Sequence, residues 1–590
     1  MTHILSEIRI KNFKSIKDET LQLSAFTPLV GYNNAGKSNI LEAIKWLLRS
    51  TALSETAFNN QSLAVEMEGK ISGISAVILG QLPANQQTAI QPYLFTDLLH
   101  IKRIQAQPNS GAKGINLLVR DPANIGNATE WRNAPTGLPQ ALEVLFPEPI
   151  HIGAMENAEE DVSKSKNTTT IGKLLGEIIG PIQTSYSTQV QSALDGIKEL
   201  LDVDGTSRAA ELTAFDAAVS GKVESFFPGV NIKVHVPTPE LKEVFSKGTI
   251  KVFENLNPSG RDVSALGHGA QRSIQMALVR HLADIKRVSG SLTSNTILLI
   301  DEPELYLHPQ AIEVLRDALK TLSTQGYQVI FSTHSPFMIT SKDVGNTLLI
   351  RKNDTHGTHK RNSLRAAIPT VVSTAPSQLE LIFSLSHSSN ILFSERVILA
   401  EGTTENRLLP SIIQKVTTKT IGLHKTALVS MGGSGNTRKA MLVLKTMDIP
   451  TKAIVDLDFA LKHGERDGFL AAADTDVAAI QAHLASILPT HSITLIDGWP
   501  TNSSMSAADA FRLLAREAAI QANLVSLKAK MQAAGIYVWT KGTIEDHLGG
   551  IPKNETGWAN FNARLDTEDL NVILPNDHLE ITDLVTWLIS

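Results

Sequence analysis

A glycine-rich segment near the amino terminus has the residue types and spacing of a phosphate-binding loop. GYNNAGKS at 31–38 fits the pattern Gly-x-x-x-x-Gly-Lys-Ser. In such a loop backbone N–H groups surround phosphate oxygens, the lysine reaches the β and γ phosphates, and the hydroxyl binds magnesium. We therefore predict an ATP and Mg²⁺ site. Its predicted residues in this loop are Gly31, Asn33, Asn34, Ala35, Gly36, Lys37, Ser38 and Asn39, with Ser38 on the metal.

Two adjacent carboxylates follow an apolar strand pattern later in the chain. TILLI at 296–300 precedes Asp301 and Glu302. A buried strand would deliver Asp301 to the magnesium shell, and Glu302 could orient or deprotonate the attacking water. After a second strand pattern, QVIFST, the ring of His334 could hydrogen-bond a γ-phosphate. The plainer alternatives are an acidic helix cap for the pair and a structural role for the histidine.

A second group of acids occupies the last third of the chain. Glu401 ends the apolar run VILA, and Glu405 follows one helical turn later. TKAIVDLDFA at 451–460 ends another strand pattern with Asp456 and Asp458, which we expect on one side of that strand. Carboxylates at the carboxyl ends of two parallel strands form an oxygen cage suited to Mg²⁺ or Mn²⁺. Each pair alone is typical of a solvated strand end, so the prediction depends on both pairs together.

These side chains require strands that end in loops, each followed by a helix. Alternating apolar residues from 4 to 23 predict a two-stranded hairpin, and helical spacing predicts a helix over 39–48. Short pieces such as SAVIL and INLLV between 50 and 150 are strand-like. Residues 155–170 suggest a loop and 171–226 helices. Strand pattern returns at VNIKVHV, and 271–285 is again helical.

Composition limits the class of protein. A length of 590 residues predicts two to four domains. The net charge of −5 does not indicate a polyanionic partner, so any contact with DNA must use local basic patches. The sequence has no cysteine, which excludes thiolate zinc sites and cysteine nucleophiles. We find no membrane span and no signal-like amino terminus, and therefore expect a soluble, cytoplasmic protein.

The first 350 residues resemble the ABC ATPases of the SMC, Rad50 and RecF kind. The resemblance rests on NNAGKSN, GHGAQ, LLIDEPELYLHP and STHSP in this order. It implies that two heads enclose ATP, with Gly269 and Gln271 acting across the interface and 305–309 forming the D-loop. GHGAQ departs from the usual LSGGQ because His268 replaces the serine, which puts rapid ATP turnover in doubt. No Q-loop glutamine is identified.

Residues 392–590 resemble a Toprim domain, on the acids Glu401 and Glu405 of EGTTENRLLP and the later DxD. A Toprim domain directly after an ABC head is the arrangement of the OLD (overcoming lysogenisation defect) nucleases. YVWTKGTIEDHL is similar to the family segment that supplies a further metal-binding glutamate after a lysine. The resemblance implies these roles for Glu545 and Lys541. Asp546 is the alternative ligand, and a helix cap is the alternative role for the segment.

The predicted architecture is an α/β chain with five parts. They are an ABC ATPase amino-terminal part at 1–155, a helical, dimerising insertion at 156–228, the ATPase carboxyl-terminal part at 229–370, a linker at 371–391 and a Toprim domain with a mainly parallel sheet at 392–590. The glycine-rich loop 432–435 could approach a phosphate or simply turn. Lys360, Arg361 and Arg365 could contact a DNA backbone or be solvated.

The predicted function is an ATP-binding, metal-dependent DNA endonuclease or nickase. The resemblance implies a homodimer or tetramer, a role in defence against phage, and a partner protein or associated nucleic acid in some members. The alternative is an ATP-gated DNA-binding or assembly protein whose Toprim half does not cut. The preferred DNA, the effect of ATP on cutting and the oligomer size are not determined by the sequence.

Overall fold

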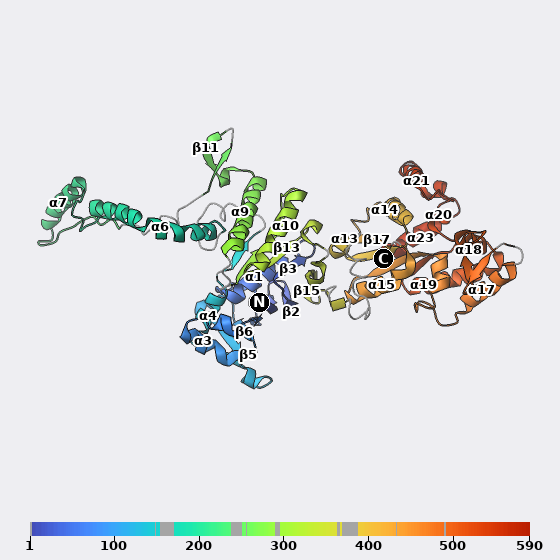
Figure 1. Cartoon of the computed structure of the whole chain (residues 1–590), viewed down its shortest axis with the longest axis horizontal. Helices are drawn as coiled ribbons and strands as arrows, with labels where there is room; N and C mark the ends of the chain where they lie inside the picture. The colour runs from blue at the N-terminus through green and yellow to red at the C-terminus, as the bar shows by residue number, and fades with distance from the viewer. Residues whose placement is uncertain are drawn as a thin grey trace. The chain divides into compact units, whose positions relative to one another are not determined.

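The chain folds into two compact units, labelled by element in Figure 1. The N-terminal unit comprises Met1–Leu29, Asn33–Met338 and Lys352–His359, and the C-terminal unit comprises Val30–Tyr32, Ile339–Arg351 and Lys360–Ser590. The computed structural model describes residues 3–147, 149–153, 170–237, 250–254, 257–289, 295–340, 342–362, 366–367, 388–431, 433–488, 491 and 493–590.

An antiparallel stretch of sheet begins the N-terminal unit. β1 (Ile4–Phe13) and β2 (Ile16–Gln22) form the predicted hairpin, in which Ile8 faces Leu21 and both are buried. The strand order continues as β8-β7-β6-β4-β1-β2. The remaining strands of this stretch are β4 (Val65–Ser72), β5 (Leu94–Phe95), β6 (Leu98–Gln105), β7 (Ile115–Arg120) and β8 (Trp131–Asn133), and β15 (Gly357–Lys360) pairs with β2.

Parallel strands carry the predicted nucleotide-site residues. β12 (Thr296–Ile300) lies between β9 (Ile150–Ile152) and β13 (Tyr327–Thr333), parallel to both. Every residue of β13 is buried, as expected for a parallel strand covered on both faces. The other elements around these strands are β3 (Phe26–Val30), β14 (Leu348–Asn353), α1 (Lys37–Leu48), α9 (His268–Ser289) and α10 (Pro309–Thr324).

Short helices replace one predicted strand in the N-terminal unit. INLLV lies in β7 as predicted, but SAVIL is not a strand, because Ala76–Leu79 forms α2. The side chain of Ser75 accepts a hydrogen bond from Ile78 N at 3.4 Å, so a serine cap favours the helix over the strand suggested by Val and Ile. Further helices here are α3 (Ala84–Ile90) and α4 (Leu138–Leu145).

The predicted helical insertion contains α6 (Thr170–Leu201) and α7 (Ala210–Glu224). The loop expected at 155–170 falls outside the described residues except for Thr170, which begins α6. VNIKVHV at 230–236 is not a strand, so that prediction was wrong. Its backbone binds side chains of α7 instead of a neighbouring strand. β10 (Lys251–Glu254) and β11 (Asn257–Asp262) pair further along the chain.

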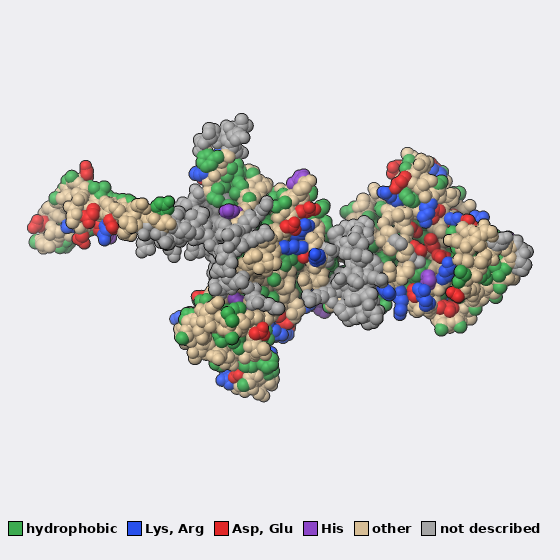
Figure 2. All heavy atoms as spheres, viewed as in Figure 1, with side chains coloured by type: hydrophobic (Ala, Val, Ile, Leu, Met, Phe, Trp, Pro, Cys, Tyr) green, Lys and Arg blue, Asp and Glu red, His purple; other side chains and the backbone are tan. Residues whose placement is uncertain are grey.

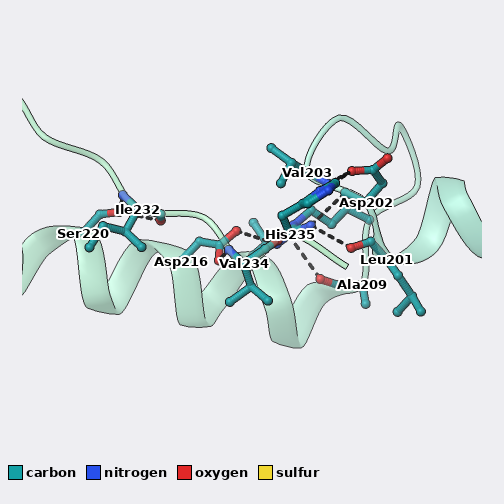
Figure 3. Close-up of polar contacts among 11 residues, drawn as sticks. Leu201, Asp202, Val203, Ala209, Asp216, Ser220, Ile232, Val234 and His235 are labelled. Carbon is teal, nitrogen blue, oxygen red and sulfur yellow. Dashed lines mark hydrogen bonds and ion pairs between the residues drawn. The ribbon is translucent and has the colours of Figure 1, made fainter. Parts of the chain in front are cut away.

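Side chains of α7 take the place of a strand partner for this extended segment (Figure 3). The N–H of Ile232 donates to Ser220 Oγ at 2.9 Å, and the N–H of Val234 donates to Asp216 Oδ1 at 2.9 Å. Arg208 donates to both Asp216 and the carbonyl of Val234, each at 2.8 Å. The hydrogen bond from Val234 N is the main cause of the lowered pKa of Asp216. Asp216 therefore stays ionised and holds the segment.

A four-stranded parallel sheet organises the C-terminal unit, as predicted. Its order is β17-β16-β18-β21, with β16 (Arg396–Ala400), β17 (Thr426–Ser430), β18 (Thr451–Asp456) and β21 (Ile536–Trp539). Alternate side chains enter two cores: Val397 and Leu399 face one and Ile398 the other.

Helices cover both faces of this sheet (Figure 1). One core is closed by α15 (Thr437–Thr446), α16 (Leu457–His463), α17 (Thr475–Ile487), α18 (Ala507–Ala515) and α19 (Gln521–Ala533). The other is closed by α14 (Thr403–Thr417), α20 (Ile544–His547), α21 (Glu555–Thr567), α22 (Leu570–Ile573) and α23 (His578–Ile589). The unit also contains α13 (Ser388–Phe393) and a hairpin of β19 (Thr494–Ile496) and β20 (Trp499–Thr501). In the described parts of the chain, no helix combines the length and apolar character needed to cross a bilayer.

The contacts of Asp216 lead to a first prediction. Asp216→Ala removes the acceptor of Val234 N and the partner of Arg208, so the 230–236 segment should detach from α7. We expect amide exchange at Val234 to accelerate about tenfold, as for the loss of one charge-assisted hydrogen bond. Hydrogen–deuterium exchange mass spectrometry measures this. Ser225→Ala is the matched control, since Ser225 Oγ donates to Lys222 O within the same helical segment. Equal exchange in Asp216→Ala and wild type would contradict the assignment.

Candidate functional site

The predicted phosphate loop connects β3 to α1, as the sequence indicated. Gly36 has φ 99°, and a Cβ there would collide with the side chain of Thr358, so the position requires glycine. Thr358 Oγ1 donates to Ala35 O at 2.8 Å, and Asn39 Nδ2 donates to Ser15 Oγ at 2.7 Å. Residues distant in sequence therefore fix the backbone of the loop.

The structure brings the predicted nucleotide-site side chains together. Ser38 Oγ donates to Asp301 Oδ2 at 2.5 Å. Lys37 Nζ lies 2.8 Å from His334 Nε2, and that nitrogen lies 3.3 Å from Glu302 Oε1. The hydrogen bond with His334 is the main cause of the lowered pKa of Glu302. Glu302 is therefore held as a carboxylate beside the lysine that would meet the phosphates.

Two residues that the sequence analysis missed shape this site. Glu304 is buried, and its Oε1 accepts hydrogen bonds from His334 N at 2.7 Å and Thr333 Oγ1 at 2.8 Å. Burial raises the pKa of Glu304. Buried Arg272 donates to the carbonyls of Asp301 at 3.0 Å and Glu302 at 2.8 Å. In the sequence, Glu304 is the second glutamate of DEPE and Arg272 directly follows GHGAQ, so both could have been found from their place in these motifs.

The predicted signature turn opens α9. Gln271 is buried, and its Nε2 donates to Leu266 O at 2.8 Å within the same chain. The ring of His268 stacks on that of Tyr306, with centroids 6.3 Å apart, and Gly269 lies against the same tyrosine. The turn therefore contacts the predicted D-loop at 305–309 in one chain. Action of Gly269 and Gln271 across a dimer interface stays a prediction.

Three carboxylates converge at the carboxyl ends of β16 and β18. Glu401 directly follows β16, and Asp456 ends β18 and donates its N–H to Glu401 Oε2 at 3.0 Å. One oxygen each from Glu401, Asp456 and Asp458 lies within 4.8 Å of the others. The expectation that Asp458 belongs to the strand was wrong, because Asp456 caps α16 and Asp458 lies in its first turn. The helical turn still directs Asp458 to the same point.

Two further carboxylates extend this cluster. Glu405 on α14 is buried and accepts a hydrogen bond from Trp539 Nε1 at 3.2 Å. Glu545 on α20 is buried, and its Oε1 accepts from Thr404 Oγ1 at 2.6 Å. Its Oε2 has no hydrogen-bond partner among the described residues. We refer to these two and the previous three as the acidic cluster.

Asp546 caps a helix, which is the alternative role that the sequence analysis considered for this segment. Its Oδ2 accepts hydrogen bonds from Thr543 N at 3.1 Å and Thr543 Oγ1 at 2.9 Å, which is a helix capping box. The same oxygen accepts from Arg512 Nε at 2.9 Å. The geometry therefore places Glu545 in the acidic cluster and Asp546 in the cap.

Electrostatics indicate what the acidic cluster could hold. Desolvation and the charges of Glu401, Glu405 and Asp458 raise the pKa of Asp456 well above its usual value. Desolvation and the charges of Glu545 and Glu401 raise the pKa of Glu405. Carboxylates this close repel one another unless a cation lies between them. Together with the unpartnered oxygen of Glu545, this set fits hard divalent cations such as Mg²⁺ or Mn²⁺.

The lysines that lie near these acids do not include the predicted Lys541. Lys462 Nζ lies 3.3 Å from Asp458 Oδ2. Lys541 Nζ pairs with Asp577, and its backbone N–H donates to His547 Nε2 at 3.0 Å. Lys553 Nζ instead lies 3.7 Å from Glu545 Oε1, and its charge lowers the pKa of Asp456. The sequence analysis missed Lys553, which follows the glycine pair of HLGGIPK. Both glycines have positive φ, so a tight turn brings the lysine back.

A second group of possible metal ligands consists of His547, Asp577 and Glu580. Lys541 pairs with Asp577 and Lys528 pairs with Glu580, so side-chain cations already neutralise both acids. The His547 ring packs on Trp539, with centroids 5.0 Å apart. His547 therefore packs against the tryptophan that binds Glu405, and lysines compensate the two acids of this group.

The remaining predicted positions lie outside the acidic cluster or outside the described residues, and the roles predicted for them stay predictions. Gly433 N donates to Glu401 O at 3.2 Å, so its loop meets the acidic cluster through a carbonyl, while Gly432 lies outside the described residues. Arg361 is half-buried with Nε 4.0 Å from Asp448, and Lys360 is half-buried as well. Arg365 and residues 371–387 of the predicted linker lie outside the described residues, and 388–391 belong to α13.

Comparison with known proteins decides the family. Residues 4–122 and 126–339 match the AAA ATPase domain, and residues 392–458 match the overcoming lysogenization defect protein-like TOPRIM domain. The chain is 37% identical, over an alignment of 603 residues covering all of both proteins, to the Old nuclease of Escherichia phage P2. The chain belongs to the OLD nuclease family. It is an ATPase-nuclease that joins an ABC-type head to a TOPRIM domain.

Two further relatives of this OLD family member agree with the assignment. It is 22% identical to an OLD nuclease of Thermus scotoductus, with 77% of this chain and 82% of the relative aligned. It is 23% identical to the endonuclease GajA of Bacillus cereus, with 70% of this chain and 68% of the relative aligned. Both alignments span more than either matched domain alone.

The hydrogen bond from Trp539 to Glu405 leads to a second prediction. Trp539→Phe keeps an aromatic ring but removes the N–H that orients Glu405. We expect about tenfold weaker Mn²⁺ binding, as for the loss of an outer partner of a metal ligand. Isothermal titration calorimetry measures the affinity, and thermal unfolding verifies folding. Trp499→Phe is the matched control, since Trp499 stacks on Phe511 outside the acidic cluster. Unchanged Mn²⁺ affinity in Trp539→Phe would refute this positioning role.

Proposed function

We propose that this protein is a divalent-metal-dependent DNA endonuclease or nickase controlled by ATP. The observation that carries the proposal is the convergence of Glu401, Asp456 and Asp458, within 4.8 Å, beside the buried acids Glu405 and Glu545. Such an oxygen-rich group has the chemistry of a two-metal phosphodiester site. The names of the relatives support the same reaction. The family resemblance extends the proposal to defence against phage.

Different residues of the acidic cluster would hold different metal ions in the proposed reaction. Two bound divalent cations would supply an activated water and stabilise the departing 3′ oxygen. Glu401, Asp456 and Asp458 would hold one cation, and Glu405 with Glu545 would help hold the second. Lys553 lies where a cation could offset charge on the phosphate oxygens, the role first expected of Lys541. Mg²⁺ is the expected metal, and Mn²⁺ suits the same oxygens.

The nucleotide site would control cutting rather than perform it. Lys37 and the loop N–H groups would bind ATP phosphates, with Ser38 and Asp301 on Mg²⁺. Glu302 and His334 stand where they could position a water and the γ-phosphate. These side chains belong to the N-terminal unit and the acidic cluster to the C-terminal unit, so substitutions at the two sites should have separable effects.

A plasmid assay tests the proposed function. With supercoiled plasmid in Mg²⁺ or Mn²⁺, Glu401→Ala should reduce nicking at least about a hundredfold, because it removes a ligand oxygen shared by the cluster. EDTA should abolish nicking by wild type. Lys37→Ala should still nick but lose the difference between reactions with and without ATP. Agarose gels separate supercoiled, nicked and linear forms and quantify each outcome.

The matched control for Glu401→Ala is Glu395→Ala. Glu395 lies just before the other end of β16 and pairs with Lys425 on the surface, so its loss should leave nicking unchanged. Nicking by Glu401→Ala at the wild-type rate would refute the assignment of the cluster. ATP-dependent DNA binding without any cleavage by wild type would favour the alternative, an ATP-gated binding or assembly protein.

We also propose that the helical insertion assembles two copies of the chain. Large apolar side chains on and after α7 are unusually exposed: Phe215 by 53%, Phe226 by 78% and Phe227 by 67%. Exposed aromatic groups of this kind mark association surfaces. A second copy is the occupant that the ABC-type head implies, because its signature turn serves the nucleotide of a partner head. A tetramer would require an additional surface.

Replacing the two most exposed phenylalanines tests this assembly. Phe226→Ser with Phe227→Ser should weaken self-association roughly a hundredfold, since burying each ring contributes about 1.5 kcal/mol or more. Light scattering coupled to size-exclusion chromatography gives the mass at several concentrations. Phe95→Ser is the control, because Phe95 is also exposed but lies on β5. A double variant with wild-type mass at every concentration would contradict the proposal.

A further inference from the structure

A cavity of about 790 Å³ lies beside the acidic cluster in the C-terminal unit. Its lining includes Glu545 and Gly550, and also Arg512 and Arg516 at the end of α18. The cavity therefore has one residue of the acidic cluster and two arginines in its lining. In Figure 2, Lys and Arg side chains lie beside acidic ones on the visible face of this unit.

The two arginines differ in their partners. Arg512 is occupied, since its Nε donates to Asp546 Oδ2 at 2.9 Å and its Nη1 to Asp509 Oδ1 at 3.0 Å. Arg516 is exposed, and its side chain has no hydrogen bond or ion pair among the residues that the structure describes. A guanidinium carries five donors in a planar fork that matches phosphate oxygens. Arg516 thus offers its full donor set to an anionic ligand.

Two of the other acids of the cavity already accept hydrogen bonds from Arg512. Asp546 accepts from Thr543 and Arg512, and Asp509 accepts from Ser506 and Arg512. Glu517 lies 3.2 Å from His483, which offsets its charge only when the ring is protonated. Glu545 belongs to the acidic cluster. Divalent cations in that cluster would be the largest charges nearby and would make the local potential favourable to phosphate.

We propose that this cavity receives the DNA strand next to the cut and that Arg516 binds a backbone phosphate neighbouring the scissile one. The inference rests on the proposed nuclease function and names a contact that holds the substrate in it. A nuclease with a net charge of −5 needs such local cationic contacts, because its overall charge repels DNA. Arg516 is a binding residue here and takes no part in the bond cleavage.

The test compares DNA binding and nicking by Arg516→Ala, Arg516→Lys and wild type. Fluorescence anisotropy with a labelled duplex in Ca²⁺ should give about tenfold weaker binding for Arg516→Ala, and a salt dependence shallower by about 0.9 in slope. Arg516→Lys should recover part of the affinity, since it keeps the charge but loses the fork. In Mg²⁺, the KM for nicking should rise with Arg516→Ala while kcat changes little.

Arg564→Ala is the matched control, because it removes one exposed arginine from the same unit. Arg564 lies on α21 and pairs with Glu568. This variant should bind and nick like wild type. Equal affinity and salt slope for Arg516→Ala and wild type would overturn the inference while leaving the nuclease proposal intact. Failure of wild type to nick would overturn the nuclease proposal, and the anisotropy data would still decide whether Arg516 contacts DNA.

Discussion

Mutual repulsion among carboxylates in a small, partly desolvated space is the constraint on which the C-terminal unit depends. Removing a charged group from water costs several kcal/mol unless a partner compensates it. Glu405 and Glu545 are buried, and desolvation together with neighbouring carboxylate charges raises the pKa of Asp456 and Glu405. The fold keeps these acids together through parallel strands that end at one edge and helices that begin there. The arrangement stores an unfavourable interaction that bound divalent cations would relieve.

The acids of the nucleotide site also follow the carboxyl end of a parallel strand, but neighbouring groups of the protein compensate their charges. Asp301 follows β12, as Glu401 follows β16, yet Ser38 donates to Asp301 and Arg272 binds the carbonyl of the same residue. Lys37 and His334 stand beside Glu302. Opposite charges and hydroxyls therefore surround these acids. In the acidic cluster five carboxylates lie together, and Lys462 and Lys553 pair with two of them. This difference agrees with one site for an anionic nucleotide and another for metal ions alone.

Local pattern was sufficient for much of the architecture and for the position of both sites. A glycine-rich loop between strand and helix, and acids at the ends of apolar strands, are features of consecutive residues, so the sequence could reveal them. The strand assigned to VNIKVHV failed because Asp216 and Ser220 on α7 satisfy its backbone. The strand predicted for SAVIL was wrong because the Ser75 helix cap outweighed the strand propensity of Val77 and Ile78. In both segments a specific hydrogen-bond partner outweighed the local strand propensity.

The residues that the sequence did not reveal act through tertiary partners. Trp539 meets Glu405 across 134 positions, and Lys553 reaches Glu545 only because a turn reverses the chain. Lys541 occurs in a segment resembling the family motif, but its amino group forms an ion pair with Asp577. No spacing in the sequence encodes these pairings. They follow from which helices cover which face of the sheet.

The close approach of Thr358 to Gly36 has a consequence for biosynthesis. The phosphate loop is among the first segments to leave the ribosome, but the side chain that packs against its glycine and binds Ala35 comes more than three hundred positions later. Asp301 and His334 are also translated long after the loop. A nascent or truncated chain ending before β15 would therefore expose an incomplete loop.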